Sequence, residues 1–265
     1  MTSHAGVALA GVALAGVALV RRPASTLSCG LLTHQDPAQV DLDLAYRQHE
    51  AYRAALADAG WTVRQVPDAE GCPDSVFVED TVVVSGPLAV VTRPGAEQRR
   101  PETAGTEAAV RELGLRVARI AAPGTLDGGD VLQTADVVYV GVGGRTNLEG
   151  LEQLRAHLGR TVVPVRLGPA LHLKSAVSAL PDGTLLVWPE RVDPSVFPAA
   201  REVPEASGAR VLPIGGDRVL IAKSAPRTAD LLAELGCTPV VLDISEFEKL
   251  EGSVTCISVL VPGAR

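Results

Sequence analysis

The stretch Thr81–Thr92, TVVVSGPLAVVT, contains two valine-rich runs joined by Ser85-Gly86-Pro87. Short runs of β-branched residues separated by glycine and proline are typical of a β-hairpin. A helical pattern over Thr103–Leu113 follows and is stopped by Gly114, and a further strand is predicted over Leu115–Ile120. This part of the chain therefore predicts a ββαβ unit.

The same order of elements recurs before and after this unit. The other predicted elements are a helix opened by Asp36-Pro37 and ended at Gly60, the strand Trp61–Val66, the hairpin of Val131–Thr134 with Val137–Val140, a helix capped by Asn147 that runs to Leu158, the strand Val162–Val165, the hairpin Ser178–Trp188, strands at Val211 and Val219, the helix Arg227–Leu235, and strands at Pro239 and Val254.

Polar residues mark the places where these units begin or end. Glu79, Asp127, His172, Gly215 and Cys256 follow one another at separations of 48, 45, 43 and 41 residues. A period in the forties is typical of a closed array of supersecondary units, none of which can bury its apolar face alone. The spacing predicts an α/β fold with five blades, strands near the axis and helices outside. One polar group from each blade would then meet in a central site.

The N-terminus repeats AGVAL three times between Ala5 and Val20. It lacks the charged start and the small-residue cleavage site of a signal peptide, and it is short for a transmembrane helix. We expect residues 1–16 to be a low-complexity leader and Val17–Val20 to be the first strand. Residues 17–265 are then expected to form a single catalytic domain.

Composition excludes several classes of protein. The chain has 24 basic and 31 acidic residues and a net charge of −7, with no basic cluster of the kind that binds nucleic acid. Its four cysteines form no C-x-x-C pair, so neither a zinc site nor a redox pair is indicated. We expect a cytoplasmic protein, a monomer or homodimer with reduced thiols, that contacts neither nucleic acid nor membrane.

Three of the marker residues suggest covalent chemistry. A cysteine in the valine-rich segment Ser253–Val259 is by itself an ordinary small apolar residue. If the blades bring His172 and Asp127 to Cys256, however, the three form the minimal set for an activated thiolate. The adjacent Glu79 and Asp80 lead into a core strand and suit a cationic ligand such as a guanidinium.

Several segments together resemble the dimethylarginine dimethylaminohydrolase family of the guanidino-group-modifying (pentein) superfamily. They are DSVFVED at Asp74–Asp80, TRPGAEQRR at Thr92–Arg100, TLDGGDVL at Thr125–Leu132, RTN at Arg145–Asn147, LHLKS at Leu171–Ser175 and SEFEKLEGSVTCISVL at Ser245–Leu260. The resemblance covers nearly the whole chain after the leader. It implies a five-bladed α/β propeller of ββαβ units with pseudo-five-fold symmetry.

The resemblance also implies roles for individual residues. Cys256 would be the nucleophile, His172 the general acid and base, and Asp127 the residue that orients His172. The substrate-binding residues would be Glu79 and Asp80 for the guanidinium with Phe77 beside them, Arg99 and Arg145 for the α-carboxylate, and Asp74 with the backbone carbonyls of Leu32 and Leu250 for the α-amino group.

The implied reaction is the hydrolysis of asymmetric dimethylarginine, and of monomethylarginine, to citrulline and a methylamine. It requires no metal and no organic cofactor. An arginine or agmatine deiminase, an amidinotransferase and a non-catalytic binding protein on the same fold remain as alternatives. The Cys/His/acid set argues against the binding protein, and the pair of arginines argues against agmatine, which has no carboxylate.

Overall fold

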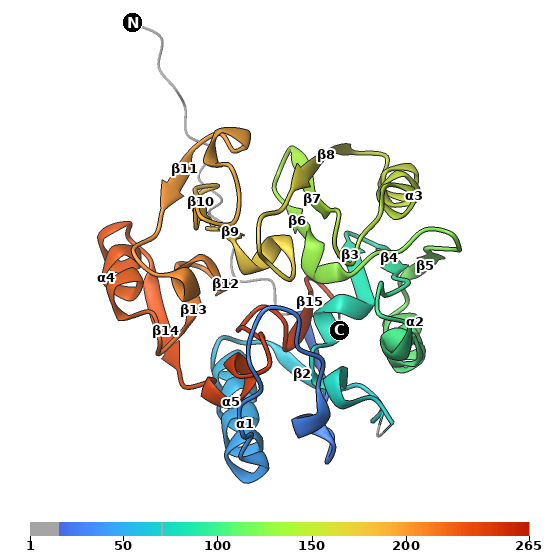
Figure 1. Cartoon of the computed structure of the whole chain (residues 1–265), viewed down its shortest axis with the longest axis horizontal. Coiled ribbons are helices and arrows are strands. Elements are labelled where there is room, and N and C mark those ends of the chain that lie inside the picture. Colours follow the sequence, from blue (N-terminus) through green and yellow to red (C-terminus); the bar gives the residue numbers. More distant parts are fainter. Residues whose placement is uncertain (1–15, 70, 265) are drawn as a thin grey trace, which may run out of the picture.

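Five small β-sheets of three strands each surround a common axis, with helices on the rim (Figure 1). This computed structural model describes residues 16–69 and 71–264. In every sheet the middle strand is antiparallel to one neighbour and parallel to the other. A parallel pair needs a long crossover connection, and in four of the five sheets this connection contains a rim helix. The predicted five-bladed α/β propeller is confirmed.

Four sheets follow one another along the chain. The first unit consists of β3 (Val82–Ser85), β4 (Leu88–Val91), α2 (Thr103–Glu112) and β5 (Arg116–Arg119), and the second of β6 (Val131–Gln133), β7 (Val137–Val142), α3 (Leu148–Leu158) and β8 (Thr161–Arg166). The third consists of β9 (Val177–Ala179), β10 (Leu185–Val187) and β11 (Ala200–Glu202). The fourth consists of β12 (Leu212–Gly215), β13 (Arg218–Ala222), α4 (Pro226–Glu234) and β14 (Thr238–Leu242).

The third of these units departs from the ββαβ pattern. Its crossover between β10 and β11 contains no α-helix, only the 3-10 helix η7 (Pro194–Val196). Pro194 occupies the first turn of η7, and the side chain of Asp193 accepts a hydrogen bond from the backbone N–H of Ser195. The connection is therefore a short capped turn, while the strand order β11-β10-β9 is that of the other blades.

The remaining sheet joins the two ends of the described chain. Its order is β15 (Ser258–Val261), β1 (Val17–Val20) and β2 (Thr62–Gln65), and α1 (Leu42–Asp58) makes the crossover from β1 to β2. The last strand pairs antiparallel with the first, Val17 opposite Val261 and Val20 opposite Ser258. This pairing closes the ring, and it confirms Val17–Val20 as the first strand.

Apolar side chains fill the spaces between neighbouring blades. In one cluster, Val83 and Val90 of one sheet pack with Val138 and Val140 of the next and with Leu151 of α3. Burial of an aliphatic side chain of this size contributes roughly 1.5–3 kcal/mol. Each blade thus covers the apolar face of the next, as the repeat period predicted.

Two local predictions are wrong. The helix predicted from Asp36-Pro37 begins only at Leu42, because Asp41 is the N-cap and its side chain accepts from the N–H of Leu44. Asp41 is itself held by its own N–H, which donates to Glu246. Val254 does not lie in a strand, since residues 253–257 form a turn that precedes β15.

The predicted leader lies almost wholly outside the described residues, which begin at Gly16. None of the helices in the described part of the chain is long and apolar enough to cross a membrane.

One buried tyrosine connects the rim helix α1 to the turn that carries Cys256. The hydroxyl of Tyr52 donates to the carbonyl of Val254 at 2.8 Å and lies 2.7 Å from the hydroxyl of Ser258. Its side chain is fully buried. Tyr52 therefore fixes both ends of the turn from behind.

We expect Tyr52→Phe to lower the free energy of unfolding by about 1–2 kcal/mol, because the carbonyl of Val254 loses its buried donor. Urea denaturation of wild type and variant measures this change. The matched control is Tyr139→Phe, since Tyr139 is also buried, at 5% exposure, but its hydroxyl has no hydrogen-bond partner among the described residues. Equal losses in the two variants would contradict the assignment.

Candidate active site

Short polar turns precede the inner strand of each blade. They are η3 (Val78–Thr81) before β3, η5 (Gly128–Asp130) before β6, η6 (Leu173–Ser175) before β9, η8 (Ala206–Ala209) before β12, and the turn 253–257 before β15. Because all five inner strands face the axis, these turns lie around one centre (Figure 1). Glu79, Asp127, His172 and Cys256 belong to or adjoin such turns, as predicted.

The prediction for Gly215 is wrong, because this glycine ends β12 rather than preceding it. The residue at the equivalent position of that blade is Arg210, which directly follows η8.

A cavity of about 330 Å³, including its open mouth, lies at this centre. It is lined by Leu31, Asp74, Phe77, Asp80, Arg99, Arg145, Leu171, His172, Leu250, Glu251, Gly252 and Cys256. Most residues expected to bind substrate are therefore found together. Asp127 lies directly behind this wall, where it bonds to His172.

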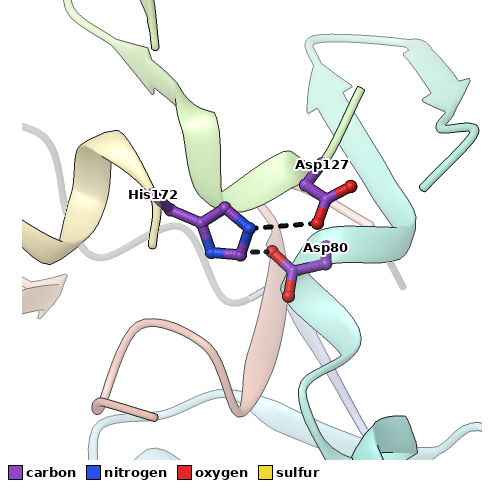
Figure 2. A group of neighbouring side chains, drawn as sticks. All are labelled: Asp80, Asp127 and His172. Carbon is purple, nitrogen blue, oxygen red and sulfur yellow. Dashed lines mark hydrogen bonds and ion pairs between the residues drawn. The ribbon is translucent and has the colours of Figure 1, made fainter. Parts of the chain in front are cut away.

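His172 is held between two carboxylates from two other blades. Its Nε2 lies 3.0 Å from Oδ2 of Asp127, and its Nδ1 lies 3.7 Å from Oδ1 of Asp80 (Figure 2). All three side chains are buried. Burial lowers the pKa of His172, but the charge of Asp80 and the bond to Asp127 outweigh it and raise the pKa to about 9. His172 is therefore a proton donor at neutral pH.

Glycine at position 129 permits this arrangement. Its N–H donates to Oδ1 of Asp80 at 2.9 Å. A Cβ at this position would lie 2.6 Å from Nδ1 of His172 and 2.7 Å from the same oxygen of Asp80. The Gly-Gly pair thus allows close approach of backbone and side chains.

Asp80 is ionised and firmly anchored. Burial raises the pKa of Asp80, but the charges of His172 and Arg99 together with the hydrogen bond from Arg99 outweigh it and lower the pKa to about 2. Arg99 Nη1 donates to Oδ2 of Asp80 at 2.6 Å. The site therefore keeps a permanent negative charge on the cavity wall.

Cys256 lies in the turn before β15, with its thiol on the cavity. Its Sγ lies 3.3 Å from the hydroxyl of Ser253 and 3.8 Å from that of Thr255. Burial, followed by the charges of Glu79 and Asp80, raises the pKa of the thiol to about 11. With these two charges beside it, the thiol is therefore protonated at neutral pH.

Glu79 occupies a different position from Asp80. It does not line the active-site cavity but faces a second hollow, where Lys174 Nζ lies 2.6 Å from its Oε1. Its Oε2 is buried without a partner among the described residues. Burial raises the pKa of Glu79 to about 7, although Lys174 opposes the shift.

Arg99 and Arg145 differ in how many of their N–H donors are already hydrogen-bonded. Arg99 is buried and bonds to Asp80, to both oxygens of Glu102 and to the carbonyls of Asp74 and Phe77. Among the described residues Arg145 donates to the hydroxyl of Thr33 alone, at 3.1 Å, and its Nη1 lies 4.0 Å from Oδ2 of Asp127. Arg145 is therefore the cation with donors to spare for an incoming anion.

A loop from the blade of β1 covers the cavity. The N–H of Leu31 donates to Asp74, and the N–H groups of Thr33 and His34 donate to Glu251 at 2.8 and 2.7 Å. Glu251 does this from a left-handed backbone with φ of 61°.

Leu32, the lid residue that the resemblance implies, does not line the cavity and packs instead against the apolar core. Leu31, one residue earlier, lines the cavity.

Sequence reasoning assigned no role to Asp130 or Glu251. Asp130 accepts from Thr146 at 2.6 Å and from the N–H of Leu173 at 3.0 Å, so it links the turn of Asp127 to the turn of His172. The second acid of LDGGD was a usable signal for Asp130. The position of Glu251 next to Leu250 offered no comparable signal.

Asp80, Asp127 and His172 present ligand atoms within 4.8 Å of one another, a set that could hold a metal ion. A metal would require a neutral His172, whereas its pKa of about 9 keeps it protonated. Arg99 and Arg145 already supply positive charge beside the two carboxylates. The electrostatics therefore favour proton transfer over metal binding.

We expect alkylation of Cys256 by iodoacetamide to rise with pH and to reach no plateau below about pH 10, because only the thiolate reacts. The raised pKa places the reactive form on the alkaline side. Peptide mass spectrometry of the Cys256 peptide separates this signal from the other three cysteines. A plateau near neutral pH would contradict a protonated resting thiol.

No protein-family model matches the chain. The chain is, however, 57% identical over 245 residues to the N(G),N(G)-dimethylarginine dimethylaminohydrolase of Streptomyces coelicolor, with 91% of this chain and 95% of that protein covered. It is 38% identical to the enzyme of the same name from Pseudomonas aeruginosa, with 91% and 97% covered.

A solved structure of a variant of that Pseudomonas aeruginosa enzyme, in complex with citrulline, matches this fold with a TM-score of 0.85 at 36% identity, covering 94% of this chain and 100% of that one. These identities extend over nearly the whole length of both chains. This protein therefore belongs to the dimethylarginine dimethylaminohydrolase family.

Proposed function

We propose that this protein hydrolyses Nω,Nω-dimethyl-L-arginine, and also monomethyl-L-arginine, to L-citrulline and the methylamine. The observation that carries the proposal is the single cavity lined by Cys256, His172 and Asp80, with Asp127 bonded to His172. The relatives that match over their full length are named for this reaction, and one solved relative holds citrulline.

Substrate recognition follows from the charges around the cavity. Asp80 lines the cavity and is the proposed acceptor for the guanidinium, with Phe77 packed beside it. Glu79 does not line this cavity, so its proposed contribution is limited to its unpartnered Oε2. Arg145 and the remaining Nη1 N–H of Arg99 are proposed to bind the α-carboxylate.

Asp74 and the carbonyl of Leu250 are proposed to receive the α-amino group. For the lid contact we assign Leu31 in place of Leu32, because Leu31 is the one that lines the cavity.

The surrounding carboxylates keep Cys256 a neutral thiol, so the substrate has to help form the nucleophile. A guanidinium bound at Asp80 and Glu79 offsets the two charges that raise the pKa of the thiol. It therefore favours the thiolate only when the target carbon is in place. The proton of the thiol leaves to solvent through the mouth of the cavity, because His172 already carries a proton. Such coupling also protects the resting cysteine from side reactions.

The thiolate of Cys256 then adds to the central guanidinium carbon. The proton of His172 goes to the departing dimethylamine as the C–N bond breaks, which leaves a covalent thiouronium. Neutral His172 next takes a proton from water, hydroxide adds to the same carbon, and the C–S bond breaks to release citrulline. Asp127 keeps the imidazole oriented throughout, and this acid–base assistance is worth roughly 10²–10⁴ in rate.

We also propose that residues 17–265 act as one catalytic domain, since β15 and β1 share a sheet. The cytoplasmic location and the monomeric or homodimeric state stay predictions.

We expect the purified protein to release dimethylamine from asymmetric dimethylarginine faster than it releases ammonia from arginine at equal concentrations. Assays of citrulline, dimethylamine and ammonia in one mixture measure both rates. Faster release of ammonia from arginine would contradict the proposal and would indicate an arginine deiminase instead.

Cys256→Ser is expected to lower the rate of citrulline formation at least roughly 10³-fold, because a serine hydroxyl is a far weaker nucleophile here. The substitution should leave the unfolding midpoint unchanged. The control is Cys29→Ser, which alters an exposed thiol outside the cavity and should retain full activity. Residual activity of more than about a tenth of wild type would rule out Cys256 as nucleophile.

A further inference from the structure

Another cavity, separate from the hollow at Glu79 and Lys174, adjoins the active site. It has a volume of about 290 Å³, including its mouth, and shares Leu171 and Glu251 with the active-site cavity. Its polar lining includes Arg191, Arg210 and Ser175. None of the roles proposed above uses the two arginines.

The two guanidinium groups share one acceptor. Arg210 Nε and Arg191 Nη1 donate to the same carbonyl, that of Ser175, at 3.3 and 3.4 Å. Neither arginine forms an ion pair with a carboxylate among the described residues, and each keeps four N–H donors without a protein partner. This contrasts with Arg99, whose donors are bound by two carboxylates.

Arg210 is 9% exposed, so its charge is largely removed from bulk water. Burial, and next the like charge of Arg191, lower the pKa of Arg210. Glu251 is the one carboxylate that lines this cavity, and both of its oxygens already accept N–H groups of the lid. Arg210 is thus a buried cation beside a half-buried one, and the carboxylates of Glu251 and Glu248 offset its charge only in part, because its pKa is still lowered. An anion bound between the two arginines would complete this compensation.

The position of Arg210 in the repeat supports a ligand role. It lies two residues before β12, as Asp80 lies two residues before β3 and Cys256 two residues before β15. Four blades thus direct a functional group toward the axis. The remaining blade directs a cation to the adjoining cavity.

We propose that Arg191 and Arg210 form a binding site for a small phosphate-type oxyanion, either free phosphate or the phosphate group of a small monoester. Two planar guanidinium forks with eight free donors match the several acceptor oxygens and double charge of such a group. The site is distinct from the substrate site and does not depend on the hydrolytic activity.

The test is calorimetric titration of the full-length protein with inorganic phosphate and, separately, with glycerol phosphate. We expect saturable binding of one anion per chain, and the tighter of the two ligands identifies the source. Arg191→Gln should weaken binding by at least about tenfold, because it removes charge-assisted hydrogen bonds. Arg210→Lys, which retains the charge but loses the fork, should also weaken it, and it serves if Arg191→Gln is unstable.

Two controls separate this site from its surroundings. Arg166→Gln removes the same charge from an exposed position of the neighbouring blade and should leave the affinity within about twofold. Arg145→Gln alters the substrate cavity and should also leave it unchanged. The proposal is overturned if wild type shows no saturable binding of either anion, if Arg191→Gln binds as well as wild type, or if Arg145→Gln alone abolishes binding.

Discussion

The antiparallel pairing of β15 with β1 is the constraint on which the rest of the structure depends. It places the last strand of the chain beside the first and so makes a ring out of a linear series of ββαβ units. Because the ring closes, the turn that carries Cys256 faces the turns of Asp80, Asp127 and His172, which lie far earlier in the chain. Tyr52 reinforces this closure from the rim, since its hydroxyl binds the carbonyl of Val254 in the same turn.

Because these turns converge, the axis of the ring carries an excess of buried negative charge. Buried carboxylates gather around one histidine and one thiol, so the histidine keeps its proton and the thiol does too. The protonated histidine is ready to act as the acid, but the protonated thiol does not attack until a cation arrives. A guanidinium relieves the excess negative charge, and the same event makes the nucleophile and positions its target. The site is in this sense complementary to a cationic substrate before any specific contact is considered.

Much of the fold could be predicted because it is encoded locally. Valine-rich runs, glycines at helix ends and the N-cap Asn147 mark the strands and helices of the blades. The spacing of the residues at the turns gives the number of blades. The identities of those residues suggested the catalytic set. The predictions that were wrong concern features that are determined by contacts between residues far apart in the sequence. Asp36-Pro37 is as good a local helix start as Asp41, but Glu246 holds the N–H of Asp41. The ion pair of Glu79 with Lys174 spans 95 residues, and no local pattern reports it. The exchange of Leu32 for Leu31, and of Gly215 for Arg210, depends on the path of the chain in space.

The central claim is that Cys256 attacks the guanidinium carbon and that the amine leaves before water enters. Rapid acid quenching during turnover, followed by mass spectrometry of the Cys256 peptide, tests it most directly. The account predicts one adduct on Cys256, of identical mass with asymmetric dimethylarginine and with monomethylarginine, because the methylated nitrogen has already departed in both. Adducts that retain the methyl groups, or a Cys256 that stays unmodified while citrulline accumulates, would contradict it.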